Sequence, residues 1–527
     1  MFALTKRSAR AVILAMAMAV FVGACAPGAK SPGGVSGGSP QVKPELVRSA
    51  SILGAASLPP NMDPVSPDGQ YAAVVRTTPQ GMDLAAVSLW DADVQKTLHS
   101  VSKDHLSQCA FSYVPLGWTG DTELLFAIFG WQNSGPHEDM RGIAILKGDV
   151  ADSSSTEEAF LELAYDFPLK YLIAAKFTPA SGKAFFAITG AIWEYDLAQA
   201  RFSLVRDGLP IPESTYCYPE FSPDGRYCVY GVRDGHRDGV YLLDLNSGEE
   251  TPLATDGDFA YFYPAWSPDS TQVAMYAANR LEGRPGTSWS DYDIVPGEDG
   301  PWPTAGTIAL TDVVEKTLSI ISVPGKLLSG MRWSGDSKSL AFLGCRLQGV
   351  PSGQSQDASQ RQLSYEDVYL VFTGGSESRT GEPQLLARLA GGGQGPSAAS
   401  VSAVDPSGTG VYYTIGGEYP VSWYAKKGGT PVKLEPQDIT TVDSAISGAP
   451  ITYGEHLVAI TRAGGKTKLG LLKQGAFTAF AEFEDLQPVS TVWVDRETLA
   501  VCRNSDDPSG AGSASISLYR MYPSESW

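Results

Sequence analysis

The sequence is poor in the residues that build metal centres and disulfide frameworks, with six cysteines and five histidines among 527 residues. No Cys-x-x-Cys occurs, and the histidines do not fall at metal-ligand spacings. No glycine-rich phosphate loop stands between an expected strand and an expected helix. We therefore expect no metal and no other cofactor.

Basic residues are also scarce. The chain has 39 lysines and arginines against 58 aspartates and glutamates, which gives a formal net charge of −19 at pH 7. Nucleic-acid binding needs a basic surface, so nucleic acid is excluded as a partner. An acidic surface also disfavours direct docking onto anionic lipid headgroups.

The N-terminus has the pattern of an export signal. Lys6, Arg7 and Arg10 precede an apolar run over residues 11–22. The run is too short to span a bilayer and has the length of a signal-peptide core. No later run is long and apolar enough to be a transmembrane helix, so we expect the folded body to lie in water.

The apolar run closes on Val-Gly-Ala-Cys25, which resembles a bacterial lipobox. The resemblance implies that residues 1–25 are a lipoprotein signal peptide and that Cys25 carries the lipid. The chain would then be anchored on the extracytoplasmic side of a bacterial membrane. An ordinary secretory signal with a coincidental cysteine is the alternative. Residues 26–44 are rich in Gly, Pro and Ser, lack acidic residues, and are predicted to be a flexible tether.

Residues 218–253 show the repeating unit of the chain in its clearest form. Pro223-Asp224-Gly225 predicts a hairpin turn, because proline fixes φ and glycine accepts φ > 0. Four β-rich segments are expected strands: residues 219–222, 226–232, 239–245 and 249–253. One such antiparallel sheet cannot bury two apolar faces alone, so it needs neighbouring sheets.

The chain supplies these neighbours by repeating the pattern. Clear copies occupy residues 63–75, 264–276, 331–343 and 404–414; looser ones occupy 117–128 and 177–188, and degenerate ones 451–460 and 492–502. Repeats of this length with this turn are typical of propeller blades. We predict an all-β fold, a single β-propeller of four-stranded antiparallel blades over residues 45–527.

The turns carry a family resemblance. The Ser-Pro-Asp-Gly units at residues 66–69 and 222–225, and the Ser-Pro-Asp-Ser unit at 267–270, resemble the repeats of TolB-like propellers. They are also similar to the WD-repeat-like propellers that precede prolyl-oligopeptidase-type hydrolases. The resemblance implies a propeller that binds other molecules. The hydrolase domain would need strand–helix alternation over some hundreds of residues, which the sequence does not show.

Nine units can be counted along the chain, which is more than most propellers contain. We expect residues 45–58 to close the ring by pairing with the last blade. We also expect the N-terminal strand and the degenerate final units to share one blade, or one unit to lie outside the ring. These assignments predict eight blades, with seven as the alternative.

Three connections are unusually long. If the four strands of a blade are lettered a to d from the centre outward, residues 130–141, 279–306 and 345–367 all join strands b and c. Because strands alternate in direction, all three connections emerge on one face of the disc. Long loops on a rigid scaffold are often functional, although disorder is the expected alternative for residues 345–367.

The insertion at 279–306 is the main candidate binding surface, because it interleaves aromatic and charged residues as recognition surfaces do. Its alternative role is to fold Trp289 and Trp302 onto its own blade. The candidate partner-binding residues are Arg280, Arg284, Trp289, Asp291, Tyr292, Asp293 and Trp302, with Trp131 and His137 from the insertion at 130–141.

The cysteines after Cys25 are predicted to be buried thiols. Counting back from the turn at Pro223 places Glu220, not Cys217, opposite Cys228. A disulfide across that hairpin is therefore not expected.

These patterns favour a binding or scaffold module for a protein, a peptide or an envelope polymer, with no catalytic residues assigned. The alternative is a propeller-type hydrolase or lyase that acts on polysaccharide or peptide at the central channel. Carboxylates for such chemistry would come from different blades and leave no local motif. A surface protein without a specific ligand is a third hypothesis.

Overall fold

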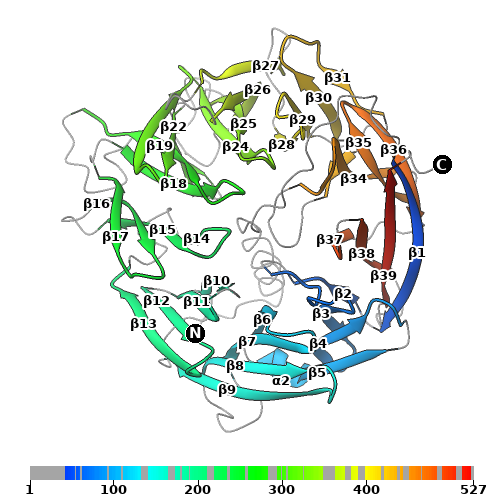
Figure 1. Cartoon of the computed structure of the whole chain (residues 1–527). Coiled ribbons are helices and arrows are strands. Elements are labelled where there is room, and N and C mark those ends of the chain that lie inside the picture. Colours follow the sequence, from blue (N-terminus) through cyan, green and yellow to red (C-terminus); the bar gives the residue numbers. More distant parts are fainter. Residues whose placement is uncertain are drawn as a thin grey trace, which may run out of the picture.

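The structure is a computed structural model. It describes residues 42–523, except 54, 60–61, 92–93, 109–110, 132–140, 164–171, 179–180, 189, 210–218, 234–237, 256–258, 283–293, 298–299, 304–306, 325, 348–362, 374–380, 390–397, 417–419, 436–438, 443–449, 464–465, 484–488, 496 and 506–512. In this part of the chain nine antiparallel sheets stand in a ring around a common centre (Figure 1). The fold is a β-propeller, as predicted.

The first four blades follow each other in chain order, each from the innermost to the outermost strand. Blade 1 consists of β2 (Ala55–Ser57), β3 (Tyr71–Thr78), β4 (Gly81–Ser88) and β5 (Gln95–Ser102). Blade 2 consists of β6 (Phe111–Trp118), β7 (Glu123–Trp131), β8 (Arg141–Asp149) and β9 (Ser154–Glu162). Blade 3 consists of β10 (Leu172–Thr178), β11 (Lys183–Ile188), β12 (Ala191–Asp196) and β13 (Arg201–Asp207). Blade 4 consists of β14 (Glu220–Phe221), β15 (Tyr227–Arg233), β16 (Asp238–Asp244) and β17 (Glu250–Ala254).

The next three blades keep the same order. Blade 5 consists of β18 (Phe259–Trp266), β19 (Gln272–Asn279), β22 (Thr307–Asp312) and β23 (Thr317–Ser322), with the extra hairpin β20 (Ile294–Gly297) and β21 (Gly300–Pro303) between β19 and β22. Blade 6 consists of β24 (Leu327–Trp333), β25 (Ser339–Leu347), β26 (Leu363–Phe372) and β27 (Gln384–Arg388). Blade 7 consists of β28 (Ala399–Val404), β29 (Gly410–Ile415), β30 (Val421–Lys426) and β31 (Val432–Lys433).

The last two blades contain the degenerate repeats. Blade 8 consists of β32 (Ile439–Thr441), β34 (His456–Ala463), β35 (Lys466–Lys473) and β36 (Ala476–Phe483), with β33 (Thr452–Tyr453) as a fifth strand. Blade 9 consists of β37 (Val489–Trp493), β38 (Thr498–Ser505) and β39 (Ser513–Pro523), and its outermost strand is β1 (Val42–Leu53).

The predicted number of blades, eight or seven, is wrong, because the structure has nine. The N-terminal strand and the degenerate units do not merge into one blade. Residues 439–483 form a complete sheet without the Ser-Pro-Asp-Gly turn, and residues 489–523 supply three strands of another. A blade therefore needs apolar strands and short connections more than it needs that particular turn.

The ring is closed by the N-terminal strand, as the sequence predicts, but this strand covers residues 42–53, and residues 55–57 form β2 of blade 1. β1 pairs antiparallel with β39 from Val42 opposite Pro523 to Leu53 opposite Ser513, with a bulge between Leu46 and Arg48. Figure 1 shows β1 (blue) beside β39 (red) at the outer rim. The first and last strands of the body are thus held in one sheet.

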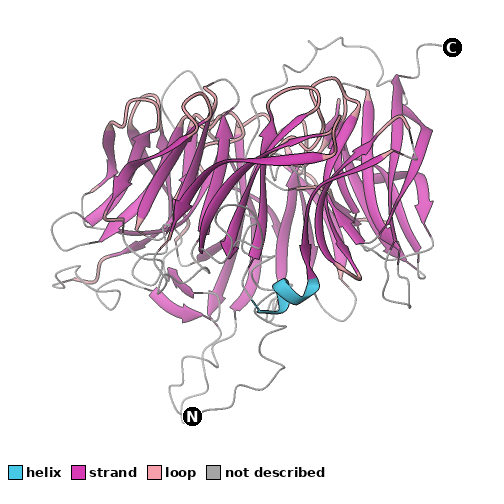
Figure 2. Cartoon of the chain, turned by 90° about the horizontal axis from the view of Figure 1, so that it is seen from below, coloured by secondary structure: helices cyan, strands magenta, loops and turns pink. Residues whose placement is uncertain are grey.

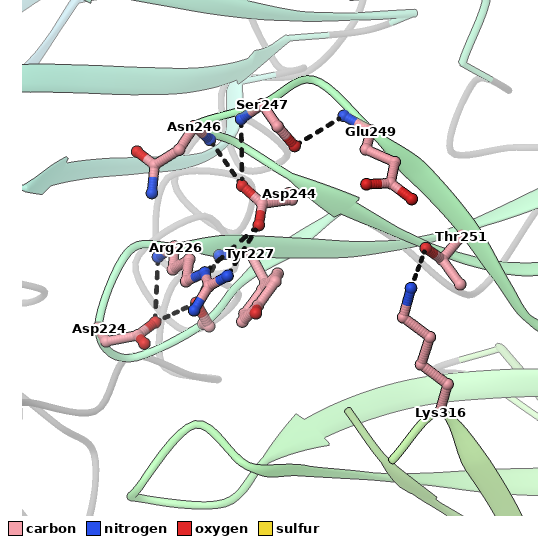
Figure 3. Close-up of polar contacts among 10 residues, drawn as sticks. Asp224, Arg226, Tyr227, Asp244, Asn246, Ser247, Glu249, Thr251 and Lys316 are labelled. Carbon is pink, nitrogen blue, oxygen red and sulfur yellow. Dashed lines mark hydrogen bonds and ion pairs between the residues drawn. The ribbon is translucent and has the colours of Figure 1, made fainter. Parts of the chain in front are cut away.

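Blade 4 shows how the turn residues shape the hairpins (Figure 3). The Ser222 hydroxyl donates to Asp224 Oδ1 at 2.6 Å and accepts the Tyr227 N–H at 2.8 Å. Asp224 Oδ1 also accepts the Arg226 N–H at 3.0 Å. At the next turn, Asp244 accepts the backbone N–H groups of residues 246 and 247. These side chains bind the backbone groups that the tight turns leave unpaired.

The expected pairing of Glu220 with Cys228 is wrong by one residue. Phe221 lies opposite Cys228, and Glu220 lies opposite Val229. The turn holds one more residue than the count assumed, because Ser222 lies opposite Tyr227 and Arg226 belongs to the turn. Among the described cysteines, Cys228, Cys345 and Cys502 are buried thiols and form no disulfide, as predicted.

The core lies between neighbouring sheets. Apolar side chains of blade 3, such as Phe185, pack against those of blade 4, such as Tyr230, and each adjoining pair of blades repeats this arrangement. Indole N–H groups of innermost strands also bond to the preceding blade: Trp118, Trp266 and Trp333 donate to the backbone carbonyls of Pro64, Glu220 and Ala265.

The disc has two distinct faces (Figure 2). The turns between strands a and b and between strands c and d lie on one side, here called the turn face. The b–c connections and the links between blades lie on the other, here called the insertion face. Helix α2 (Lys103–Gln108), which links blades 1 and 2, marks the insertion face in Figure 2. In the described part of the chain no helix has the length and apolar character to cross a membrane.

Candidate functional site

The candidate site lies on the insertion face of blades 5 and 6, where two long b–c connections come from neighbouring sheets. In blade 6, β25 extends to Leu347 and β26 begins at Leu363, so both ends of the predicted loop 345–367 are paired strand. Disorder was expected over this whole loop, and that expectation is wrong at its two ends.

The blade 5 insertion contains a hairpin that was not predicted from the sequence. β20 and β21 pair antiparallel, with Val295 opposite Trp302 and Gly297 opposite Gly300. β21 lies against β19 of its own blade and β24, the innermost strand of blade 6. The Pro-Gly and Gly-Pro dipeptides at residues 296–297 and 300–301 were the available signal for this turn. The insertion therefore reaches across to the neighbouring blade.

The structure places few of the predicted site residues. Arg280 is exposed just beyond β19, Trp302 belongs to β21, and Trp131 ends β7 opposite Arg141. The other predicted residues lie outside the described residues: Arg284, Trp289, Asp291, Tyr292, Asp293, His137 and the proposed lipidation residue Cys25. These assignments stay predictions.

An ionic cluster in blade 6 was not predicted. Lys326, just before β24, contacts the carboxylates of Glu366 and Asp367, with 2.6 Å between its Nζ and Asp367 Oδ2. Arg346 Nε lies 3.2 Å from Glu366 Oε2. The Lys326, Glu366 and Asp367 side chains are 10–18% exposed, whereas Arg346 is 61% exposed. We call these four residues the rim cluster.

A β-bulge explains why two consecutive carboxylates reach one lysine. In the β25–β26 pairing Gly344 lies opposite Asp367 and Cys345 opposite Tyr365, so Glu366 has no partner across the ladder. An extra residue of this kind disturbs the alternation of side chains between the two faces. Glu366 and Asp367 can then both face Lys326, which a regular strand would prevent.

The rim cluster is balanced in charge. Burial lowers the pKa of Lys326, but hydrogen bonds and attraction from Asp367 and Glu366 more than offset this, and the net shift is upward. The lysine therefore stays protonated. Burial raises the pKa of the neighbouring Cys345 thiol to about 12, despite the opposing effect of Lys326. A thiol in this state is not a nucleophile at neutral pH.

Blades 5 and 6 are also joined beside the channel. The Met331 N–H of blade 6 donates to the Tyr276 hydroxyl of blade 5 at 3.1 Å. Tyr276 is 4% exposed, and its pKa is raised mainly by burial. Tyr263 meets the Tyr276 ring edge-on, with 6.4 Å between ring centroids. The contact between the two blades is thus aromatic near the centre, whereas the rim cluster lies entirely within blade 6.

A second polar feature lies in the channel wall of blades 3 and 4. Lys176 of β10 is 8% exposed, and Glu220 of β14 has a buried Oε1 without a hydrogen-bond partner. Burial raises the pKa of Glu220 well above its usual range, and Lys176 partly offsets the shift. Lys176 and Glu220 precede Phe177 and Phe221 near the ends of their strands. Ala265 and Ala403 stand at the same place in blades 5 and 7, before Trp266 and Val404. The fold therefore does not need a charge there.

The described residues contain no group of three or more His, Cys, Asp or Glu side chains that could hold a metal ion. Glu366 and Asp367 share one lysine, so each is committed to an ion pair. An acid/base pair instead needs carboxyl groups whose environments separate their pKa values.

Comparison with known proteins gives no family. No family model matches the chain, and no curated protein matches it. Among solved structures, it is similar to an oligogalacturonate lyase from Vibrio parahaemolyticus at 14% identity and a TM-score of 0.32, covering 66% of this chain and 89% of that one. It is similar to TolB from Acinetobacter baumannii at 12% identity and a TM-score of 0.25, covering 77% and 79%. These scores are too low to support an argument about activity, so the propeller assignment rests on the sheet topology.

Proposed function

We propose that this protein is a lipid-anchored, extracytoplasmic binding module that presents the insertion face of blades 5 and 6 to a protein, a peptide or an envelope polymer. One observation carries the proposal: the blade 5 insertion forms a hairpin against the innermost strand of blade 6. A loop that only connected β19 to β22 would not need this hairpin. Insertions on rigid scaffolds commonly form recognition surfaces.

Charge and anchoring fit this proposal. The acidic composition favours solubility in water, and the pattern around Cys25 resembles a lipidation site. β1 begins at the outer rim of the turn face, since Val42 pairs with Pro523. A tether before residue 42 would therefore join the disc at the face opposite the insertions, which leaves the insertion face open to a partner.

The proposal is tested with the soluble body, residues 42–527, and two loop variants. One replaces residues 282–303 with a short Gly-Ser turn, and the matched control replaces residues 375–380 between β26 and β27 on the turn face. All three are immobilised and exposed to envelope extract of the source organism, and retained components are identified by mass spectrometry. We expect a component retained by the intact body and by the control but lost from the first variant. Equal retention by all three would contradict the proposal.

A second candidate function draws on Glu220. A buried carboxyl group with a raised pKa in a channel wall has the character of the general acid in glycoside chemistry. A hydrolase or lyase would need a second carboxylate about 5–10 Å away. If the body degrades polysaccharide, Glu220→Gln should abolish the activity, and an unchanged rate would remove Glu220 from the reaction.

A further inference from the structure

Ser270 and Ser337 occupy a turn position that other blades give to glycine. They are the fourth residues of the a–b turns of blades 5 and 6, with φ of 64° and 63°. Gly69, Gly225 and Gly408 hold this position in blades 1, 4 and 7, with φ of 70–71°. In all five turns the N–H of this residue donates to the carbonyl of the first turn residue. A serine in this left-handed region is strained, whereas glycine adopts it at little cost.

The two serine hydroxyls each bond to the a–b turn of the preceding blade. The Asp224 N–H of blade 4 donates to Ser270 Oγ at 3.0 Å, and the Asp269 N–H of blade 5 donates to Ser337 Oγ at 2.9 Å. Both serines are buried, at 5% and 6% exposed. A glycine at either position would leave the backbone N–H of the preceding turn without this acceptor.

A tryptophan adds a second bond at each of these two interfaces. Trp266 donates its indole N–H to the Glu220 carbonyl of blade 4 at 3.1 Å, and Trp333 donates to the Ala265 carbonyl of blade 5 at 3.0 Å. Each tryptophan stands four residues before the serine of its blade, and the two groups that it and the serine bind also lie four residues apart. We call this pair of bonds the interblade clamp. It joins blade 5 to blade 4 and blade 6 to blade 5.

The residues of the adjoining blades explain where the clamp ends. Blade 4 has Phe221 and Gly225 at the two positions, and a Cβ at Gly225 would lie 2.2 Å from Thr178 Oγ1 of blade 3. Blade 7 has Val404 and Gly408. Phenylalanine, valine and glycine have no side-chain group that could donate or accept these hydrogen bonds. The clamp therefore joins three consecutive blades and stops on both sides of them.

The clamped blades include the two that carry the candidate site. On the turn face, blades 5 and 6 are joined by the bond between Asp269 and Ser337. In the blade 5 insertion, β21 lies against β24 of blade 6. The Met331 N–H also donates to the Tyr276 hydroxyl across the same interface. The relative position of blades 5 and 6 is thus fixed by bonds outside the insertion itself.

We propose that Ser270 and Ser337 are positioning residues, which hold blades 4, 5 and 6 as one rigid sector beneath the proposed binding surface. The proposal rests on the proposed binding function and names the residues that fix the geometry of its surface. The interblade bonds offset the backbone strain at the two serines. A partner then meets a preformed surface, which lowers the entropic cost of binding.

Hydrogen–deuterium exchange of the full-length chain tests the rigid sector without a partner. Ser270→Gly and Ser337→Gly keep the turn, since glycine holds this position in other blades, but remove the hydroxyl. Ser337→Gly should speed exchange at least about tenfold in β18 and β24, and Ser270→Gly should do so in β14 and β18. The matched control is Ser153→Gly, because Ser153 has φ 54° in the exposed c–d turn of blade 2. It should leave the innermost strands unchanged.

Two results of this measurement would overturn the proposal. Unchanged exchange in the serine variants would show that the hydroxyls do not hold the blades together. An equal rise in all nine blades would show that the serines contribute only to global stability and do not define a sector.

Retention of a partner tests the positioning role. The full-length chain, the double variant Ser270→Gly/Ser337→Gly, the Ser153→Gly control and the chain with residues 282–303 replaced are immobilised and exposed to envelope extract. The component lost on replacement of residues 282–303 should be retained at least about tenfold more weakly by the double variant and fully by the control. Full retention by the double variant would overturn the positioning role and leave the proposed function standing. Equal retention by all four chains would overturn the proposed function and the positioning role together, and exchange alone would then decide whether blades 4–6 form one sector.

Discussion

At the scale of single residues, the Ser-Pro-Asp-Gly turn does more than reverse the chain. Gly225 has φ 71°, and a Cβ there would lie 2.2 Å from Thr178 Oγ1 of blade 3. Gly248, in the next turn of the same blade, also has φ 71° but faces open space. The two glycines therefore share a backbone requirement and differ in their contact with a neighbouring blade.

This difference gives a matched pair of variants. Gly248→Ala should lower the free energy of unfolding by about 1–2 kcal/mol, the cost of a left-handed conformation for alanine. Gly225→Ala should cost about 1–3 kcal/mol more, because Thr178 must also move. Urea denaturation of both variants measures the difference. Equal losses would mean that the contact between blades 3 and 4 at this turn has no effect on stability.

His99 links the stability of the first two blades to pH. Its Nδ1 lies 2.8 Å from the Tyr113 hydroxyl, and burial lowers its pKa to about 4 although Asp83 opposes the shift. The unfolded chain binds a proton below about pH 6.5, whereas the folded protein does so only near pH 4. This histidine therefore reduces stability as the pH falls from 6.5 to 4, by up to about 3 kcal/mol.

The variant His99→Gln tests this effect, because glutamine can still bond to Tyr113 but does not titrate. The free energy of unfolding is measured for both proteins at pH 7 and at pH 4.5. Subtracting the value of one protein from that of the other at each pH removes the contribution of the other titrating groups. Among these, Glu220 acts in the opposite direction: its raised pKa favours the folded protein at low pH, and that stability is lost as the pH rises. A difference that does not change with pH would contradict the account of His99.

At the scale of elements, the local pattern predicted the strands well and the irregularities poorly. The strands of blade 4 lie within one or two residues of their predicted bounds, because alternating apolar residues and Pro-Asp-Gly turns determine them locally. The bulge at Glu366 was not predictable, since it arises from the register between two strands separated by an insertion. The rim cluster depends on that bulge, so it was missed as well.

The rim cluster itself should matter for stability. Lys326→Met would leave the largely buried Asp367 carboxylate without its cation and Glu366 with only the exposed Arg346, and we expect a loss of about 3 kcal/mol. Lys466, which pairs with Glu482 at the surface with side chains 40% and 42% exposed, is the control. Lys466→Met should cost less than about 1 kcal/mol. Similar losses for the two variants in thermal or urea unfolding would show that the rim cluster is an ordinary surface network.

At the scale of the whole molecule, the sequence was sufficient for the propeller but not for the number of blades. Nine repeats were visible, yet the final units lack the turn motif and were merged with the N-terminal strand. The structure gives each of them a sheet, because their apolar strands pack between neighbours as well as those of the clear repeats do. Of the candidate site, the sequence predicted only that the blade 5 insertion lies on one face of the disc.

Closure of the ring depends on β1. A protein that starts at residue 54 lacks this strand and exposes the edge of β39, whereas one that starts at residue 42 keeps it. We expect the shorter protein to unfold at a lower temperature, with loss of cooperativity and a tendency to associate through the open edge. Calorimetry and size-exclusion chromatography of the two proteins measure this. Identical behaviour would show that β39 does not need its partner.

The measurement that tests the central claim most directly is hydrogen–deuterium exchange of the body, with and without the component captured from the envelope. The account predicts slower exchange in residues 279–306 and where β24 and β26 begin on the insertion face of blades 5 and 6. Slower exchange confined to the turn face, for example around residues 222–225, would contradict the proposal that blades 5 and 6 present the binding surface.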